Sequence, residues 1–438
     1  MRIWPVLLPS AVVLAAPAAA QPAPPPPPKL IVAISVDQLA SDIFDDYRPL
    51  LNGGFARLGR GTVFPHAYQG HAASETCPGH STILTGAHPA RNGIIANSWY
   101  DLGQARADKA VYCAEDERVP GSTSSAYTVS PWHLKVPTLG DYLKRQWPQS
   151  RTVAVAGKDR SAVMMTGQRP DQRWYWNGKT FATDLAGVAT PRSVESARTA
   201  IAAQVAQAQP GLEPPTLCSA KATPVAVGGG GQPVGAGRFA RAAGDLTLFR
   251  ASPEFDGATL ALAAALVREM TLGKSAAPDL LAVGLSATDY VGHRYGTEGQ
   301  EMCLQMLSLD RDLGDFLAFL DREVGDYAVV LTADHGGKDI PERERVAGTP
   351  GASRVDPTLG AAAMGKVLGT RLGIPGTLLY GGNFGDIYVD RALAPAQKKQ
   401  VMAAALAAYR AHPQVEAVFT HDQLARTAIP TTTPDRWR

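Results

Sequence analysis

The sequence carries almost no net charge and has no runs of basic residues. Its 438 residues include 42 Lys and Arg against 40 Asp and Glu, which leaves a formal net charge of +2. Proteins that bind nucleic acids or anionic membrane surfaces concentrate Lys and Arg on one segment or one face. We therefore expect no nucleic-acid partner, and any positive charge that matters to function should be local.

Cysteine is also scarce. The four cysteines, Cys77, Cys113, Cys218 and Cys303, form no C-x-x-C pair, so a structural zinc cluster is not expected. In an oxidising compartment two disulfides would be the default. Four cysteines allow three connectivities, and the sequence does not choose among them.

Long apolar runs are absent after the N-terminus. The apolar stretch at residues 6–16 follows Met1-Arg2 and precedes Ala18-Ala19-Ala20, which is the pattern of a secretory signal peptide with an A-x-A cleavage site. This stretch is shorter than the roughly 20 residues that a membrane-spanning helix needs. We expect a signal peptide at 1–20, a Pro-rich tether at 21–29, and a periplasmic or secreted protein without integral membrane association.

Four short apolar runs, typical of buried strands, are separated by segments with helical periodicity. They cover residues 30–36, 152–156, 280–285 and 328–332. This alternation predicts an α/β fold with a doubly wound, mostly parallel sheet flanked by helices. The clearest predicted helix, 301–322, has apolar residues near i, i+3, i+4, i+7 spacing and leaves Asp310, Asp312 and Arg322 for solvent.

We expect one catalytic domain over residues 30–438, with insertions near 100–150 and 160–255 that cap the sheet. Residues that favour loops, such as Pro214-Pro215, occur in the second insertion. Trp174 and Trp176, at a predicted hairpin inside it, either line a substrate pocket or pack in the core of the cap. Packing is the favoured interpretation.

Carboxylates and imidazoles follow three of the predicted strands. Asp37 ends the first run, Asp289 and His293 follow the third, and Asp334-His335 follow the fourth in Ala-Asp-His-Gly-Gly. A single Asp in such a place is often only a helix or turn cap. Parallel strands end at the same edge of a sheet, so the three together predict a site of metal ligands suited to phosphoryl or sulfuryl transfer.

Between the first two strands, the segment Ser74-Glu75-Thr76-Cys77-Pro78 begins a predicted helix, because proline favours the first helical turn. Thr76 would then stand at the helix N-terminus, where the helix dipole and free amides would stabilise an alkoxide. Thr76 is therefore a candidate nucleophile, the alternative being a simple N-cap. His80, one turn further on, is interpreted as a buried packing histidine rather than a general base.

These motifs resemble the alkaline phosphatase superfamily, specifically the bacterial periplasmic alkaline phosphatases with a threonine nucleophile, from residue 30 to about residue 390. The resemblance implies an alkaline-phosphatase-like fold with cap insertions and a site for two Zn²⁺ ions. One zinc site would be formed by Asp37, Thr76, Asp334 and His335, with Thr76 both ligand and nucleophile. The other would take Asp289 and His293.

The resemblance also implies that Asn97 donates to a phosphate oxygen and that Lys158 and Arg160 clamp the phosphate. A monoester dianion spreads its charge over three nonbridging oxygens, which suits a Lys beside an Arg capable of bidentate binding. We therefore expect an exported zinc-dependent phosphate monoester hydrolase, acting on small-molecule esters as a monomer through a phosphothreonine intermediate.

Two other functions remain possible on these residues: a phosphodiesterase or nucleotide pyrophosphatase of the same superfamily, and an inactive exported binding protein on that scaffold. A sulfatase fits poorly, because sulfatases need Cys-x-Pro-x-Arg and here Cys77-Pro78-Gly79-His80 places the proline one position early.

One departure from the family pattern concerns the second zinc site. The family takes a further His from a Thr-x-His-Gly segment near the C-terminus, and this sequence contains no such segment. The late histidines His412 and His421 do not follow strand patterns. We expect that the chain is truncated and that its gene encodes roughly a hundred more residues carrying the missing ligand.

Overall fold

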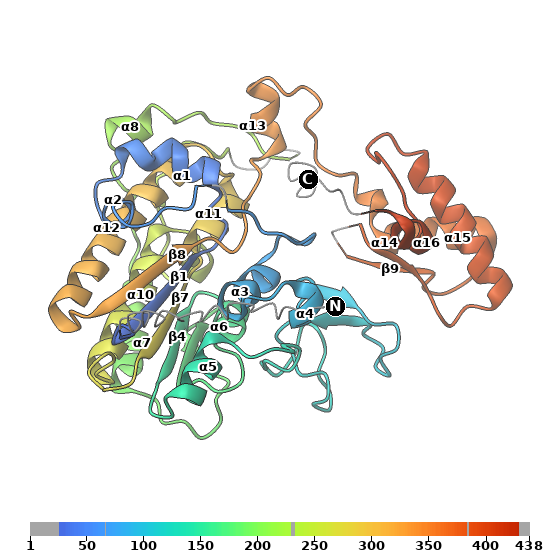
Figure 1. Cartoon of the computed structure of the whole chain (residues 1–438). Coiled ribbons are helices and arrows are strands. Elements are labelled where there is room, and N and C mark those ends of the chain that lie inside the picture. The colour runs from blue at the N-terminus through green and yellow to red at the C-terminus, as the bar shows by residue number, and fades with distance from the viewer. Residues whose placement is uncertain (1–25, 66, 229–232, 383–384, 429–438) are drawn as a thin grey trace, which may run out of the picture.

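The computed structural model describes residues 26–65, 67–228, 233–382 and 385–428. A six-stranded sheet forms its centre, with strand order β6-β5-β4-β7-β1-β8 (Figure 1). All neighbours pair in parallel except β5 and β6, which form an antiparallel hairpin. The predicted signal peptide and most of the predicted tether lie outside the described residues.

The strands are β1 Leu30–Val36, β2 Ser98–Tyr100, β3 Ala110–Tyr112, β4 Thr152–Ala156, β5 Gln172–Trp176, β6 Phe181–Ala182, β7 Asp279–Leu285, β8 Tyr327–Thr332, β9 Leu379–Gly381 and β10 Ile387–Val389. The helices are α1 Ser41–Tyr47, α2 Gly54–Leu58, α3 Thr76–Thr85, α4 Pro89–Asn92, α5 Leu139–Gln146, α6 Asp159–Thr166, α7 Arg192–Val205, α8 Thr216–Ser219, α9 Leu246–Arg250, α10 Pro253–Glu269, α11 Ala287–Tyr295, α12 Gln300–Glu323, α13 Pro341–Val346, α14 Ala361–Leu372, α15 Pro395–Arg410 and α16 His421–Arg426, with 3₁₀ turns at Arg48–Leu50 and Pro357–Leu359. The four predicted strands are β1, β4, β7 and β8, and the predicted long helix is α12.

Helices cover both faces of the central strands (Figure 1). Successive residues of a strand face opposite sides, and β1 shows the consequence. Val32 and Ile34 pack in the larger apolar cluster, together with residues of α10 and α12. Ala33 packs in a second cluster, with residues of α3, α5 and α6. Because both faces are covered, these strands are continuous apolar runs, which is why the sequence pattern located them.

The segment 160–255 differs from the expectation of a cap insertion. It supplies β5 and β6 to the central sheet and most of α6 to the helix layer beside β4. Trp174 and Trp176 lie on β5 and are 0% and 4% exposed, so they pack in the core. The aromatic run indicated a hairpin correctly, but its place in the main sheet depends on β4, a partner that local patterning does not reveal.

Asp310 on α12 is buried, although the helical periodicity assigned it to solvent. Its carboxylate accepts hydrogen bonds from the N–H groups of Asn52, Gly53 and Phe55 at 2.9, 2.7 and 2.8 Å. These amides lie at the start of α2, where helical N–H groups have no partner within the helix. The side chain is therefore buried because a distant segment supplies its donors.

The C-terminal residues form a lobe with its own apolar cluster, which stands apart from the central sheet in Figure 1. Leu368 of α14, Leu379 of β9 and Val401 of α15 lie in that cluster. The lobe touches the β2–β3 hairpin, where the rings of Tyr100 and Tyr380 are 6.0 Å apart. The sequence patterns did not indicate this separate lobe.

Two disulfides are formed, Cys77–Cys113 and Cys218–Cys303. They settle the connectivity that the sequence left open, and they indicate an oxidising, exported environment. Among the described residues, no helix is long and apolar enough to cross a membrane.

Removing the Cys218–Cys303 bond should destabilise the fold. The bond links α8 to α12 across a sequence separation of 85 residues, and it restricts the unfolded chain accordingly. We expect Cys218→Ala with Cys303→Ala to lower the free energy of unfolding by about 2–5 kcal/mol in chemical denaturation. Ser219→Ala, next to Cys218 and without effect on the bond, is the control. An unchanged denaturation midpoint in the double variant would contradict the prediction.

Asp256 on α10 should make stability depend on pH. It is 1% exposed and accepts a hydrogen bond from the N–H of Ala287 at the start of α11. Burial, only partly offset by this N–H, raises its pKa from 3.8 to about 7. The folded protein therefore keeps a proton that the unfolded chain has lost, so this contribution to stability is present below about pH 4 and is lost as the pH rises toward 7.

Asp256→Asn, which keeps the shape and removes the charge, should consequently become more stabilising relative to the wild type as the pH rises from about 5 to about 8. The midpoint of urea denaturation measured across this range checks the prediction. A difference between variant and wild type that does not change with pH would refute the assignment.

Candidate active site

Three neighbouring strands of the sheet deliver carboxylates to one edge. Asp37 directly follows β1, Asp289 lies on α11 just after β7, and Asp334 with His335 follows β8. Because β7, β1 and β8 are adjacent and parallel, their carboxyl ends lie side by side. The sheet therefore brings these residues to one edge, as the sequence predicted.

Asp37, Asp289 and His335 form a buried group whose ligand atoms all lie within 4.8 Å of one another. His335 Nε2 is 3.3 Å from Asp37 Oδ1, 4.0 Å from Asp289 Oδ1 and 3.5 Å from Asp334 Oδ2. Asp37, Asp334 and His335, which were predicted for one zinc site, thus lie in one cluster with Asp289, which was predicted for the other.

The donor set suits a metal ion. Asp37 is 0% exposed, and neither of its carboxylate oxygens accepts a hydrogen bond from any described residue. The Lys158 ammonium lies 2.6 Å from Asp37 Oδ2, a contact that compensates charge without hydrogen-bond geometry. Buried polar atoms are normally paired. Carboxylate oxygens left without donors, beside an imidazole, are groups that could bind a metal ion.

His293 lies at the margin of this cluster. Its Nε2 is 3.1 Å from Asp289 Oδ1, one helical turn away on α11, but its side chain is 70% exposed. Of the two late histidines, His412 pairs with Asp356 at 3.4 Å and the side chain of His421 is 96% exposed. Both lie in or next to the C-terminal helices α15 and α16.

Thr76 is the first residue of α3 and is 2% exposed. The helix packs closely on the end of β8, since a Cβ added at Gly79 would lie 2.2 Å from the backbone oxygen of Asp334. His80, on the same helix, is 0% exposed, and its Nδ1 lies 2.9 Å from Thr76 O and 3.0 Å from Asp334 Oδ2. His80 is thus a buried, hydrogen-bonded residue that contacts the carboxylate cluster.

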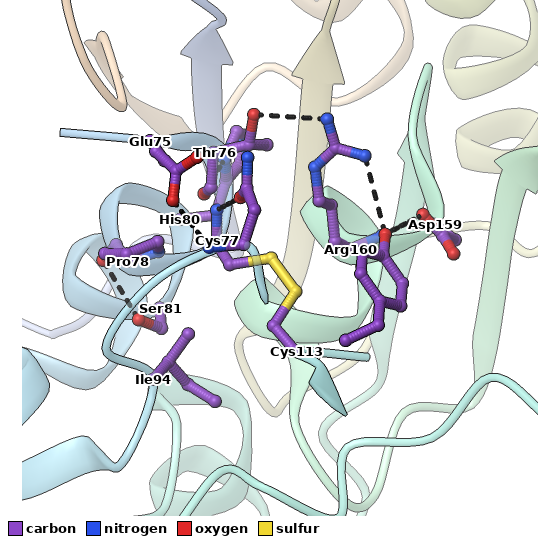
Figure 2. The surroundings of a disulfide bond; sticks show 12 residues. Glu75, Thr76, Cys77, Pro78, His80, Ser81, Ile94, Cys113, Asp159 and Arg160 are labelled. Atoms are coloured by element: carbon purple, nitrogen blue, oxygen red, sulfur yellow. Dashed lines mark hydrogen bonds between the residues drawn. A yellow bond between two sulfur atoms is a disulfide. The ribbon is translucent and has the colours of Figure 1, made fainter. Parts of the chain in front are cut away.

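Two cations converge on the Thr76 hydroxyl. Lys158 Nζ is 3.3 Å and Arg160 Nη2 is 3.5 Å from Thr76 Oγ1. Lys158 follows β4 and also donates to Asp289 Oδ2 at 2.6 Å, so one ammonium spans the hydroxyl and the carboxylates. Arg160 approaches Thr76 from α6, as Figure 2 shows.

Asn97 is held against Thr76 by the residues of a disulfide. Its Oδ1 accepts from the N–H of Cys77 at 2.8 Å, and its backbone oxygen accepts from the N–H of Cys113 at 2.9 Å. Glu75 accepts the backbone N–H of Asn97 at 2.7 Å. Figure 2 shows the Cys77–Cys113 bond joining the start of α3 to the segment after β3. Asn97 is therefore fixed beside Thr76 by contacts at three points.

Sequence reasoning missed the residues that hold Arg160. Tyr112 and Tyr127 each donate to a different oxygen of Asp159 at 2.8 Å, and Arg160 Nη1 is 3.4 Å from the Tyr112 hydroxyl. In the sequence, only the position of Asp159 between Lys158 and Arg160 could have indicated that Arg160 is held by a neighbouring acid. Tyr112 and Tyr127 lie in the 100–150 segment, and no sequence pattern links them to Arg160.

The charges of the cluster stabilise one another. Burial would lower the pKa of Lys158, but the carboxylates of Asp37 and Asp289 outweigh it and raise that pKa above its usual value. Burial would likewise raise the pKa of Asp334, but His80 and His335 outweigh it and hold that pKa well below its usual range. For His335, burial is outweighed by Asp37 and Asp334, and its pKa rises to about 9. Each of these three buried groups is therefore stabilised by partners of opposite charge.

Comparisons with known proteins agree with this geometry. Residues 31–350 match the type I phosphodiesterase/nucleotide pyrophosphatase family. The chain is 51% identical over 412 residues to alkaline phosphatase PhoK of Sphingomonas sp., covering 93% of this chain and 73% of that protein. It is 44% identical over 414 residues to alkaline phosphatase PhoD of Zymomonas mobilis, covering 93% and 71% respectively.

The crystal structure of alkaline phosphatase PafA is similar in fold and in sequence. It superposes with a TM-score of 0.81 at 27% identity, covering 94% of this chain and 82% of that one. The chain therefore belongs to the type I phosphodiesterase/nucleotide pyrophosphatase family, within the alkaline phosphatase superfamily.

Proposed function

We propose that this protein is an exported, zinc-dependent phosphate monoester hydrolase with Thr76 as its nucleophile. The observation that carries the proposal is the convergence of Lys158 and Arg160 on the Thr76 hydroxyl, beside a buried group of metal-ligand type. The alkaline phosphatases to which the chain is 51% and 44% identical support the same activity.

The donor set is complete for one zinc ion and supplies only two ligands for a second. Asp37, Thr76, Asp334 and His335 would hold one ion, and Asp289 with His293 would contribute two ligands to the other. When bound, zinc supplies positive charge that favours the alkoxide form of a nearby hydroxyl and offsets negative charge on phosphate oxygens.

The chain's own residues carry the remaining steps. Thr76 Oγ forms a bond to phosphorus while the bond from phosphorus to the ester oxygen breaks, and the alcohol leaves. Lys158 and Arg160 donate to nonbridging oxygens as their charge develops. Asn97, whose Oδ1 is engaged by Cys77, directs its amide N–H groups to a phosphate oxygen. Water then cleaves the phosphothreonine and restores Thr76.

Export to the periplasm is part of the proposal. Two disulfides, one of them beside the nucleophile, support an oxidising compartment. Small phosphate esters are the proposed substrates, and a monomer is the proposed state.

A phosphodiesterase is the second candidate, because the matching family takes its description from that activity. A diester carries one charge less than a monoester and a second bulky group. The buried Lys158 and the Arg160 guanidinium favour the more highly charged monoester, and substrate comparison separates the two functions.

Thr76→Ala should lower hydrolysis of p-nitrophenyl phosphate by roughly 10³-fold or more, because no other group replaces the nucleophile. Thr76→Ser should keep part of the activity, since it retains a hydroxyl. Thr82→Ala, on the same helix, is the matched control and should remain active with an unchanged unfolding temperature. Phosphate trapped on the wild-type enzyme at low pH should map to Thr76 by mass spectrometry; label on another residue would show that the nucleophile is elsewhere.

The wild type should prefer p-nitrophenyl phosphate to bis-p-nitrophenyl phosphate in kcat/KM by orders of magnitude. Arg160→Ala, and more so Lys158→Ala with Arg160→Ala, should reduce this preference by on the order of 2 kcal/mol or more, about 30-fold, through lost charge-assisted hydrogen bonds. Asn97→Ala should cost less, since one neutral donor is lost.

Arg118→Ala is the matched control for this series, because Arg118 pairs with Asp116 at the surface. Zinc content should be measured for each variant, since Lys158 also contacts Asp37 and Asp289. Equal rates of the wild type on both esters would replace the monoesterase proposal with the phosphodiesterase.

A further inference from the structure

Gln38 has a backbone conformation that side chains rarely adopt. It directly follows Asp37 after β1, and its φ is 66°. A non-glycine residue in the left-handed region carries about 1 kcal/mol or more of strain, and such residues persist where their surroundings hold them. Gln38 is also only 6% exposed. Its contacts therefore outweigh both strain and burial.

Those contacts join two carboxylates of the active site. The backbone N–H of Gln38 donates to Asp334 Oδ1 at 3.1 Å, and its side-chain Nε2 donates to Asp289 Oδ1, also at 3.1 Å. Asp334 follows β8 and Asp289 lies after β7, on either side of the β1 strand that carries Gln38. One residue thus bridges the two outer members of the cluster.

The surrounding backbone is shaped to accept this amide. A Cβ added at Gly292 on α11 would lie 1.9 Å from Gln38 Oε1, and one added at Gly337 would lie 2.7 Å from its Cδ. Gln38 Oε1 is buried and accepts no hydrogen bond from the described residues. The site therefore uses the donor side of the amide, and a carboxylate of the same shape would face Asp289 with like charge.

We propose that Gln38 is a positioning residue that sets the orientation of Asp289 relative to Asp334, and with it the spacing of the two metal positions. This inference rests on the proposed metal centre. Donors bound to ligating carboxylates fix the direction of their free lone pairs, and removing such a donor typically weakens metal binding by about 10–100-fold. In this left-handed conformation the N–H donates to Asp334 while the side chain donates to Asp289.

The test compares zinc binding in the wild type, Gln38→Asn, Gln38→Gly and Gln38→Glu. Asn and Gly tolerate the left-handed region but cannot reach Asp289, so the metal-free variants should still fold, with an unfolding temperature below that of the wild type because a buried contact is lost. Gln300→Ala is the control, because Gln300 is a buried amide that donates to the backbone oxygens of Ala236 and Gly237.

Zinc dissociation constants are measured by competition with a chromophoric chelator, up to millimolar zinc because a site with two protein ligands is weak. In Gln38→Asn and Gln38→Gly, the weaker of the two constants should increase by about 10–100-fold, and the stronger one by less. Gln38→Glu should alter the stronger constant and the absorption spectrum of the cobalt-substituted protein as well. Gln300→Ala should bind zinc like the wild type.

Wild-type zinc constants and an unchanged cobalt spectrum in all three Gln38 variants would overturn the positioning role and leave the metal centre standing. A wild-type chain that binds fewer than two zinc ions would instead overturn the proposed two-metal centre, and the inference with it. The two failures are therefore distinguishable in one titration.

Discussion

The active site depends on one electrostatic constraint, the burial of three carboxylates at the same edge of the sheet. Asp37, Asp289 and Asp334 are each at most 2% exposed. Ionised groups out of water are stable only when opposite charge and hydrogen bonds replace the lost hydration. Lys158 meets this requirement for Asp37 and Asp289, and His80 and His335 meet it for Asp334. The carboxylate oxygens that these contacts leave without donors are the places suited to metal.

The start of α3, which places Thr76 beside this charge cluster, is fixed on two sides. The helix dipole at the start of α3 points toward Thr76, and α3 is pinned on one side by the close approach of Gly79 to Asp334. On the other side the Cys77–Cys113 bond joins the helix to the segment that fixes Asn97. Thr76 is therefore held against two cations, and the proposed reaction would use this preorganised charge.

The fold alone does not separate a monoesterase from a diesterase, because the matching family is described as phosphodiesterases and a relative at 51% identity is named an alkaline phosphatase. The residues of the site have to separate the two activities. Lys158 is 3% exposed and Arg160 Nη1 lies 3.4 Å from the Tyr112 hydroxyl, so both residues place fixed positive charge beside Thr76. Tyr112 is itself held by Asp159. A short chain of contacts thus runs from the 100–150 segment through α6 to Thr76.

Local patterns were sufficient for the parts of this protein whose signal is periodic. Strands β1, β4, β7 and β8 are apolar along their length because helices cover both faces. The polar residues that follow three of these strands indicated the cluster of carboxylates and imidazoles. The proline in the first turn of α3 likewise indicated that Thr76 begins a helix. Each of these features is a property of a few consecutive residues.

What remained undetermined by sequence involves partners far apart in the chain. The disulfide pairing, the burial of Asp310, the place of β5 in the main sheet and the hold of Tyr112 on Arg160 each require a residue that only folding brings near. Gln38 is the sharpest case: in sequence it is a polar residue after a strand, and its strain and two carboxylate contacts exist only once β7, β1 and β8 lie side by side. The sequence by itself determined which groups reach the edge of the sheet, because strand and helix periodicity is local. Only the tertiary structure decided how those groups are oriented and paired, because hydrogen bonds and ion pairs between distant segments leave no periodic pattern in the sequence.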